Sequence, residues 1–293
     1  MKRKKCAIIV GAGAVKNAWA PVLRALQPLH DFPLTSDGAN SFLARLVYLL
    51  RWYSTDKSAH GRTQFERHME FLAEVRKSIA RELIIAQKNS EITSRNELKL
   101  ILNRFVIPYS KEFMLVSTNW DTVINQDVFN HLNQNYHCHL IPLHVHGSID
   151  NPELMYLPTE MTKEPYRTPA EEQLIGGMHG SIWRGLEQAS RVVVYGLSIS
   201  PLDAELAQTL AAGWSNSVLK EILIVDPNHQ EISHRVNLLL DRKRDICVKG
   251  FHPEKIGIEY DYSVIQLFSY SVIQLFSYSV IRHKTNKSIQ PTR

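Results

Sequence analysis

Short apolar runs alternate with amphipathic stretches along much of this chain. An unbroken apolar run is typical of a strand buried on both faces of a sheet, and apolar residues spaced three or four apart are typical of a covering helix. This alternation predicts an α/β fold with a Rossmann-like, doubly wound and mainly parallel sheet. The predicted strands cover 6–10, 113–117, 140–145, 191–195, 221–225 and 245–249, and the predicted helices cover 121–133, 170–189, 201–212 and 230–240, with another from 14 onward.

A different pattern fills residues 35–108. Amphipathic spacing there predicts helices over 41–52, 65–86 and 97–105, with no strand between them. Inside a chain of alternating strands and helices, such a block indicates an inserted helical subdomain. The predicted organisation is therefore a Rossmann domain from 1–34 and 109–250, a helical insertion from 35–108, and a tail from 251–293.

Polar side chains follow two of the predicted strands at the points where these strands end. Asn119 and Asp121 follow the run that ends at Ser117, and His146 follows the run that ends at Val145. Open α/β sheets bind ligands at the carboxyl ends of their strands, so an amide, a carboxylate and an imidazole are expected to meet in one crevice. The plainer alternatives are that Asp121 caps a helix and that His146 is a structural histidine.

The first predicted strand ends in a glycine pair, Gly11 and Gly13, before helical spacing begins. Glycine lets the backbone approach a ligand closely, and a helix start presents free N–H groups to phosphate. Lys16 stands where a full dinucleotide fingerprint has a third glycine. A bare turn between strand and helix is the alternative, and Lys16 or Asn17 is a further candidate for contact with phosphate or ribose.

Five motifs, in this order and spacing, resemble the sirtuin-type NAD-binding domain. They begin at Ile8 (IIVGAG), Ser117 (STNWD), His146 (HGS), Val192 (VVVYGLS) and Ile222 (ILIVDP), and together they span about residues 6 to 250. The resemblance is strongest to the zinc-free, bacterial antiphage-defence branch, whose members hydrolyse NAD+. Ala14 and Val15 depart from the family pattern, which has a serine and a Gly-Ile-Pro-type segment after the glycines.

The resemblance implies a role for each matching residue. Asn119 would hold a ribose hydroxyl or the attacking water, Asp121 would bind the nicotinamide carboxamide, and His146 would be the general base. Around the rest of NAD+, the implied binding residues are Gly11, Ala12, Gly13, Thr118, Gly196 and Ser198, with Asp226 at the adenosine ribose. In the family, a helical insertion covers the nicotinamide side of the cleft or mediates assembly, and Arg51, Trp52, Arg62 and Arg67 would serve either purpose or lie in solvent.

Composition places the chain among ordinary soluble proteins and excludes a disulfide scaffold. Its 293 residues are 44% hydrophobic and 22% charged, and its net charge of +5 comes partly from the basic start at 2–5. That start suits an acidic partner, nucleic acid or simple solvation. Cys6, Cys138 and Cys247 include no Cys-x-x-Cys pair, so the zinc ribbon of deacylating sirtuins is not expected, and the cytoplasm is the expected compartment.

A histidine cluster offers a metal site as an alternative. His137 and His139 precede the second site strand, and His144 and His146 would share one face of it, at a workable ligand spacing. Binding a metal would remove His146 as the base, and Asp150 is the acidic residue nearby. We expect no metal.

The tail contains an exact tandem repeat of eight residues. The segment 262–269 recurs at 270–277, and a third copy begins at 278. Its β-prone, uncharged sequence is an aggregation liability if exposed, and its serines and glutamines make it a poor membrane span. We assign it no catalytic role and expect no membrane association.

The predicted function is hydrolysis of NAD+ to nicotinamide and ADP-ribose by an antiphage effector that causes abortive infection. Because an unregulated NADase is toxic, control is expected from a sensor protein encoded nearby or from homo- or hetero-oligomerisation, with nucleic acid reached through the partner. The alternatives are an NAD-dependent protein deacylase or ADP-ribosyltransferase, a non-catalytic NAD or ADP-ribose sensor, and a basic subunit of a nucleic-acid complex.

Overall fold

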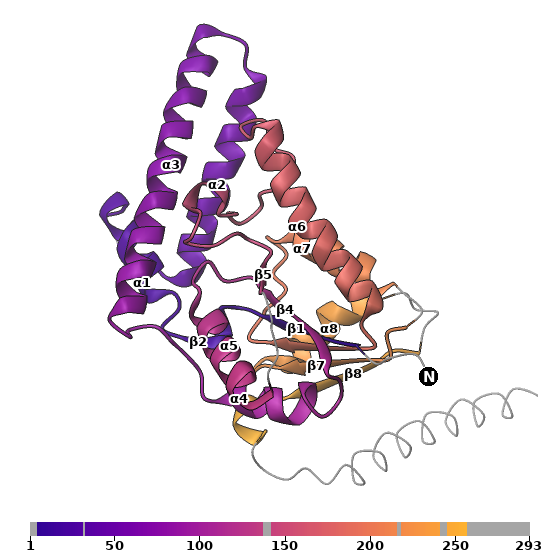
Figure 1. The fold of residues 1–293 in the computed structure, drawn as a ribbon. Helices are drawn as coiled ribbons and strands as arrows, with labels where there is room; N and C mark the ends of the chain where they lie inside the picture. Colours follow the sequence, from indigo (N-terminus) through magenta and orange to yellow (C-terminus); the bar gives the residue numbers. More distant parts are fainter. Residues whose placement is uncertain (1–4, 32, 137–141, 216–217, 241–244, 257–293) are drawn as a thin grey trace, which may run out of the picture. The chain divides into compact units, whose positions relative to one another are not determined.

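The computed structural model describes residues 5–31, 33–136, 142–215, 218–240 and 245–256 (Figure 1). Residues 1–254 form one compact unit, and 255–293 belong to a second unit that contains the tandem repeat. The repeat lies outside the described residues, as do His137, Cys138 and His139. The architecture below is that of the first unit.

A parallel sheet of six strands forms the centre of this unit. The strand order is β5-β4-β1-β6-β7-β8, and every pairing within the sheet is parallel. The chain moves outward from β1 to β5 on one side and then returns to β6 on the other, as a doubly wound sheet does. This confirms the predicted fold class. The strands are β1 (Lys5–Val10), β4 (Glu112–Ser117), β5 (Leu143–His144), β6 (Arg191–Tyr195), β7 (Glu221–Val225) and β8 (Cys247–Phe251).

Helices α6, α7 and α8 bury one face of this sheet. Alternate strand residues such as Ile9, Val194 and Ile224 form a core with Leu186 and Trp214 of the helices. On the other face, the π-helical segment Leu102–Val106 approaches β8, with the Phe105 and Phe251 rings 5.1 Å apart. Outside the predicted insertion, the helices of this unit are α1 (Ala20–Leu26), α5 (Val123–Tyr136), α6 (Pro169–Gln188), α7 (Ala204–Trp214) and α8 (His229–Leu239), and α1 packs against the helices of the insertion.

The segment predicted as an insertion supplies two long helices, α2 (Ser36–Thr55) and α3 (Ala59–Lys88), which run side by side (Figure 1). Each begins at a hydroxyl cap, because Thr35 and Ser58 accept hydrogen bonds from backbone N–H groups of the first turn. The short α4 (Glu97–Ile101) follows. These helices belong to the same compact unit as the sheet.

Three local expectations were wrong. The helix expected from Ala14 begins six residues later, as α1 (Ala20–Leu26), because a 3₁₀ turn (Ala12–Ala14) and β2 (Val15–Lys16) precede it. β2 pairs with β3 (Thr93–Ser94), so the insertion does contain a strand. Pro201 does not open α7, because Asp203 caps that helix two residues later by accepting a hydrogen bond from Leu206 N at 3.3 Å. The strand predicted over 140–145 ends one residue early, since β5 spans Leu143–His144, and residues 140 and 141 lie outside the described chain.

The glycines at the end of β1 are required by protein packing. Gly11 and Gly13 donate their N–H groups to Tyr195 O and Gly196 O at 3.0 and 2.8 Å, so two turns lie directly against each other. A Cβ on Gly11 would lie 2.5 Å from Gly196 O, and one on Gly196, whose φ is +60°, would lie 2.3 Å from Ala14 N. The N–H groups of Gly11 and Gly13 are therefore already used within the protein and are not free to donate to a phosphate.

Within the described part of the chain, no helix has both the length and the apolar content that a bilayer crossing requires.

We predict that Gly196→Ala lowers the free energy of unfolding by at least about 2 kcal/mol, because the new Cβ meets backbone atoms in a left-handed conformation. Thermal and urea denaturation measure this change. Gly177→Ala is the matched control: Gly177 lies in α6 with nothing within 4 Å of an added Cβ, so this variant should gain up to about 1 kcal/mol. Equal behaviour of the two variants would contradict the packing argument.

Candidate active site

A cavity of about 690 Å³ lies at the carboxyl ends of the central strands, where the direction of winding reverses. Nine of the predicted site residues line it: Ala12, Gly13, Thr118, Asn119, Asp121, His146, Gly196, Ser198 and Asp226. Gly11, the tenth predicted site residue, does not line the cavity. The sequence thus predicted the location of the cavity, through residues that come from the ends of β1, β4, β5, β6 and β7.

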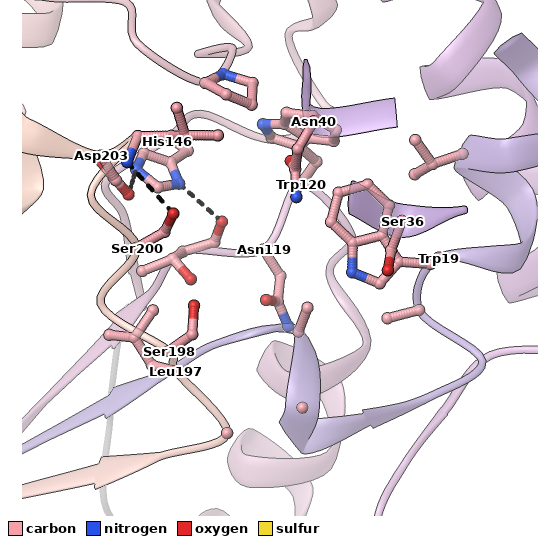
Figure 2. A pocket seen from close by; sticks show the side chains of 18 of the residues that line it. Trp19, Ser36, Asn40, Asn119, Trp120, His146, Leu197, Ser198, Ser200 and Asp203 are labelled. Atoms are coloured by element: carbon pink, nitrogen blue, oxygen red, sulfur yellow. Dashed lines mark hydrogen bonds and ion pairs between the residues drawn. The ribbon is translucent and has the colours of Figure 1, made fainter. Parts of the chain in front are cut away.

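Asn119 is the side chain in this cavity that most directly indicates a ligand. It is 6% exposed, and neither its Oδ1 nor its Nδ2 has a hydrogen-bond partner among the described residues. Its backbone is fixed separately, because Asn119 N donates to Ser117 Oγ at 3.2 Å. An unpaired buried amide is costly, by about 1–3 kcal/mol for each unsatisfied group, and is retained where a bound molecule completes its hydrogen bonds. Figure 2 shows Asn119 and His146 among the side chains that line the cavity.

Both ring nitrogens of His146 contact protein acceptors. Nδ1 lies 3.0 Å from Thr118 O, and Nε2 lies 2.9 Å from Asp203 Oδ2. The Tyr156 ring stacks on the imidazole with a centroid separation of 5.9 Å and an interplanar angle of 11°. Since a carbonyl and a carboxylate both accept, the contacts favour an imidazolium that donates from both nitrogens.

The pKa of His146 follows from these contacts. Burial alone would lower it, but the Asp203 carboxylate, by its charge and its hydrogen bond, and the Thr118 carbonyl together raise the pKa above its ordinary value.

Asp121 lies in the wall of the same cavity and is 4% exposed. Burial raises the pKa of its carboxyl to about 6, against the lowering effect of a hydrogen bond from Val123 N and of its own backbone N–H. The contact with Val123 N, at 3.1 Å, is the helix-start contact expected of Asp121. The capping interpretation and the cavity position therefore both hold.

Several lining residues were missed by reasoning from the sequence. Asp203 was hidden inside a predicted helix, and its signal is its position as a helix cap after Pro201. Ser36, Asp37 and Asn40 reach the cavity from α2, a long-range placement with no local signal. The remaining residues missed include Trp19, Trp120, Tyr156, Glu231 and Arg235.

Candidates expected at the cleft from the insertion and the first turn do not line the cavity. Arg51 forms an ion pair with Glu164, and Trp52 is exposed and stacks on Tyr48. Asn17 donates to Glu91 O at 3.2 Å. Lys16, Arg62 and Arg67 are exposed and likewise lie outside the lining.

The geometry around His144 does not favour the metal alternative. Its Nδ1 lies 2.9 Å from Asn119 O and its Nε2 lies 2.6 Å from Asn125 Nδ2, which uses both nitrogens of a neutral ring. His144 and His146 do not share one face of a strand, because only His144 belongs to β5. In the described part of the chain, no three metal-binding side chains come together.

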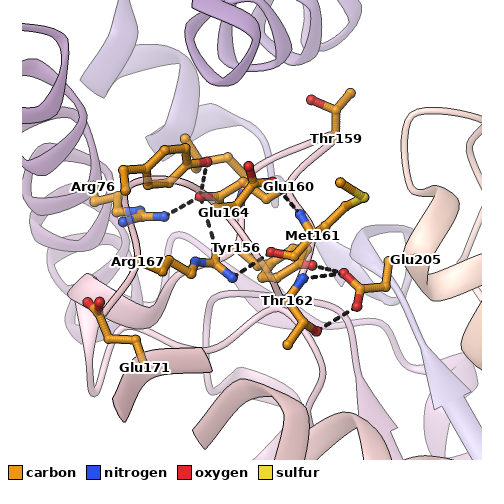
Figure 3. A network of polar contacts seen from close by, with 12 residues as sticks. Arg76, Tyr156, Thr159, Glu160, Met161, Thr162, Glu164, Arg167, Glu171 and Glu205 are labelled. Atoms are coloured by element: carbon orange, nitrogen blue, oxygen red, sulfur yellow. Dashed lines mark hydrogen bonds and ion pairs between the residues drawn. The ribbon is translucent and has the colours of Figure 1, made fainter. Parts of the chain in front are cut away.

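Buried carboxylates fix the loop that carries Tyr156 (Figure 3). Glu160 accepts from Arg76 of α3 at 2.6 Å and from Leu157 N at 2.5 Å, and it pairs with Arg167 at 3.0 Å. Arg51 of α2 binds Glu164 in the same loop. The insertion therefore holds the segment that stacks on His146.

Glu205 fastens the other side of this loop. It accepts hydrogen bonds from Tyr156 Oη and from Thr162 N and Oγ1, the last two at 2.6 and 2.5 Å, and His179 lies 3.6 Å away. Burial alone would raise the pKa of Glu205, but the contacts with His179, Thr162 and Tyr156 outweigh it and lower the pKa to about 2. The carboxylate is ionised throughout the physiological range.

We predict that Glu205 stabilises the fold above pH 4.5, its ordinary pKa, and that this contribution is lost as the pH falls toward about 2. With allowance for its 24% exposure, the contribution is on the order of 2 kcal/mol. Glu205→Gln should therefore flatten the acid limb of the unfolding free energy measured by urea titration at several pH values. Glu187→Gln, an exposed site on α6, is the control and should keep the wild-type slope. A slope unchanged in Glu205→Gln would contradict the assignment.

Comparison with known proteins gives a structural likeness alone. No protein-family model matches the chain, and no curated protein matches it in sequence. A chain from the solved structure entitled "Structural Basis for the Mechanism and Regulation of Sir2 Enzymes" is 12% identical, with a TM-score of 0.36, over 87% of this chain and 89% of that one.

Proposed function

We propose that this protein is an NAD+ glycohydrolase, which cleaves NAD+ to nicotinamide and ADP-ribose. The observation that carries the proposal is the buried, unpartnered Asn119 amide in the same cavity as His146. An amide that can both donate and accept suits a ribose hydroxyl or a water molecule, and the imidazole suits proton removal.

The reaction needs orientation and charge stabilisation more than strong nucleophilic chemistry. The bond between the nicotinamide nitrogen and ribose C1′ breaks, nicotinamide leaves with the bonding electron pair, and a water oxygen bonds to C1′ and loses one proton. In this proposal Asn119 positions the sugar or the water, and His146 accepts the proton when its Nε2 is unprotonated. The transition state is a ribosyl cation, so fixed negative charge around it stabilises the reaction.

The charges of the cavity wall agree with this chemistry. Asp37, Asp121 and Asp203 line the cavity, and carboxylates there favour the cationic nicotinamide ring and the ribosyl cation. Glu231 and Arg235 also line it and form an ion pair with each other at 2.5 Å. Arg235 donates to Ser198 O at 2.7 Å, and its guanidinium is suited to bind a phosphate oxygen as well. Since the N–H groups of Gly11 and Gly13 are used within the protein, we assign the pyrophosphate to Arg235 and to the turns at Ala12 and Ser198.

Asp226 follows the last residue of β7 at the cavity, and its Oδ1 accepts a hydrogen bond from Asn228 N at 2.8 Å. We keep it as the residue proposed for the adenosine ribose. The cavity volume falls within the roughly 300–1,000 Å³ typical of ligand sites. Aromatic side chains, including Trp19, Trp120 and Tyr156, form part of the wall.

The cellular role remains a prediction drawn from the resemblance in sequence. It is depletion of NAD+ in an infected bacterial cell, with activity controlled by a partner protein or by oligomerisation.

We predict that His146→Ala lowers NAD+ cleavage by about 10²–10⁴-fold, because a general base contributes that much, and that Asn119→Ala lowers it by about 10²–10³-fold. Chromatography of nicotinamide and ADP-ribose measures turnover, and calorimetry with NAD+ measures binding, which should be largely retained. His234→Ala and Asn130→Ala, at exposed helical positions, are the matched controls. Wild-type turnover by either cavity variant would refute the assignment.

The same assay separates the alternatives. Nicotinamide release that requires an acylated peptide would indicate a deacylase, and transfer of ADP-ribose to protein would indicate a transferase. Nucleotide binding with no nicotinamide release, even with the products of neighbouring genes added, would indicate a sensor and contradict the proposal.

A further inference from the structure

We infer that Asp203 is a positioning residue of the proposed reaction, because its carboxylate holds His146 by the nitrogen that the backbone leaves free. This inference rests on the proposed function. The residue was not expected from the sequence, and the contact joins segments 57 positions apart, from the turn after β5 to the start of α7.

The two ring nitrogens of His146 are held by different groups. Thr118 O and Asp203 Oδ2 are both acceptors, so the protonated ring donates a hydrogen bond to each. In the proposed reaction Nε2, which is held by a side chain and not by the backbone, is the nitrogen that gains and loses the proton. Asp203 Oδ2 stands 2.9 Å from Nε2, and both residues line the cavity.

The loop that presents Asp203 is held firmly. Asp203 Oδ1 accepts from Leu206 N at 3.3 Å as the cap of α7, and Asp203 N donates to Ser200 O at 2.9 Å. Ile199, a β-branched residue, has φ +49° with its side chain buried in the core. Such a backbone conformation persists only where the surrounding packing enforces it, and it is common at functional sites. The carboxylate is thus placed against His146 by the fold.

Few other charged groups face the imidazole. Tyr156 stacks on it from the 155–168 loop, and Glu160 of the same loop acts on it by charge. Glu160 is already neutralised by Arg76 and Arg167. Among the described residues, His146 is the cationic partner that Asp203 has within ion-pair distance.

The chemistry gives this pair a definite consequence. A neutral ring with its hydrogen on Nδ1 would direct the Nε2 lone pair at the carboxylate. The Asp203 carboxylate therefore favours the protonated ring. Because Asp203 Oδ2 occupies the free position of Nε2, the attacking water gives its proton to Nε2 while this contact is open, and Asp203 then forms the ion pair with the imidazolium that results. The proton passes to solvent after the products form. Asp203 therefore strengthens the base, and it also keeps the base protonated at low pH.

The variant Asp203→Asn tests this role, because asparagine caps a helix as well as aspartate does while removing the charge. In kcat/KM profiles from about pH 5 to about pH 9, the acid limb of the wild type lies above the ordinary histidine pKa and should move to lower pH in the variant. The plateau should fall about tenfold, so the ratio of variant to wild-type activity should be greater at low pH than at high pH. Asp127→Asn on α5, outside the cavity lining, is the control.

An NMR titration of the His146 ring, assigned by its loss in His146→Ala, gives a readout independent of turnover. We expect the pKa of His146 to fall in Asp203→Asn and to stay unchanged in Asp127→Asn. An unchanged pKa in Asp203→Asn overturns the inference, and so does a loss of activity by one constant factor at every pH. If the pKa of His146 falls in Asp203→Asn but the wild type never releases nicotinamide, the result contradicts the proposed function. It would then support the ion pair alone and not a role in the reaction.

Discussion

The backbone hydrogen bonds between neighbouring strand ends determine the site. Thr118 N donates to Val10 O at 2.9 Å, and Val145 N donates to Ser117 O at 3.0 Å. This register places the Thr118 carbonyl where it binds the His146 ring and leaves Asn119 as the next residue into the cavity. A shift of one residue between β4 and β5 would turn these side chains to the other face of the sheet and separate them.

Several energetically unfavourable groups and conformations lie around this cavity, as expected of a functional site. The Asn119 amide is unpaired, the Asp121 carboxyl is buried with its pKa raised to about 6, and Ile199 holds a left-handed conformation. Strong contacts outside the cavity offset them. The Glu160 and Glu205 carboxylates, whose partners reach from α3 and α6, hold the loop that stacks Tyr156 on His146.

The sequence predicted the sheet well because the apolar run of each buried strand can be recognised from the residues of that strand alone. The runs 191–195 and 221–225 match β6 and β7 to the residue, since each is apolar and bounded by charged or turn residues. The apolar runs end at the cavity, so Asn119 and His146 were found from the same signal. The sequence did not predict three features that depend on long-range contacts. These are the β2–β3 pairing, the position of α2 at the cavity, and the contact of Asp203 with His146. Glycine at 11 and 13 suggested a phosphate turn, but the approach of Gly196 explains both residues.

The central claim is that Asn119 and His146 act on one ligand, and the side-chain amide signal of Asn119 tests it most directly. In a ¹⁵N-labelled His146→Ala protein, where cleavage is blocked, that signal can be assigned by its loss in the Asn119→Ala double variant and followed as NAD+ is added. The account predicts a saturable shift of the Asn119 amide at the same NAD+ concentration that saturates binding. An Asn119 signal that stays unmoved while NAD+ binds, or the absence of any NAD+ binding, would contradict it.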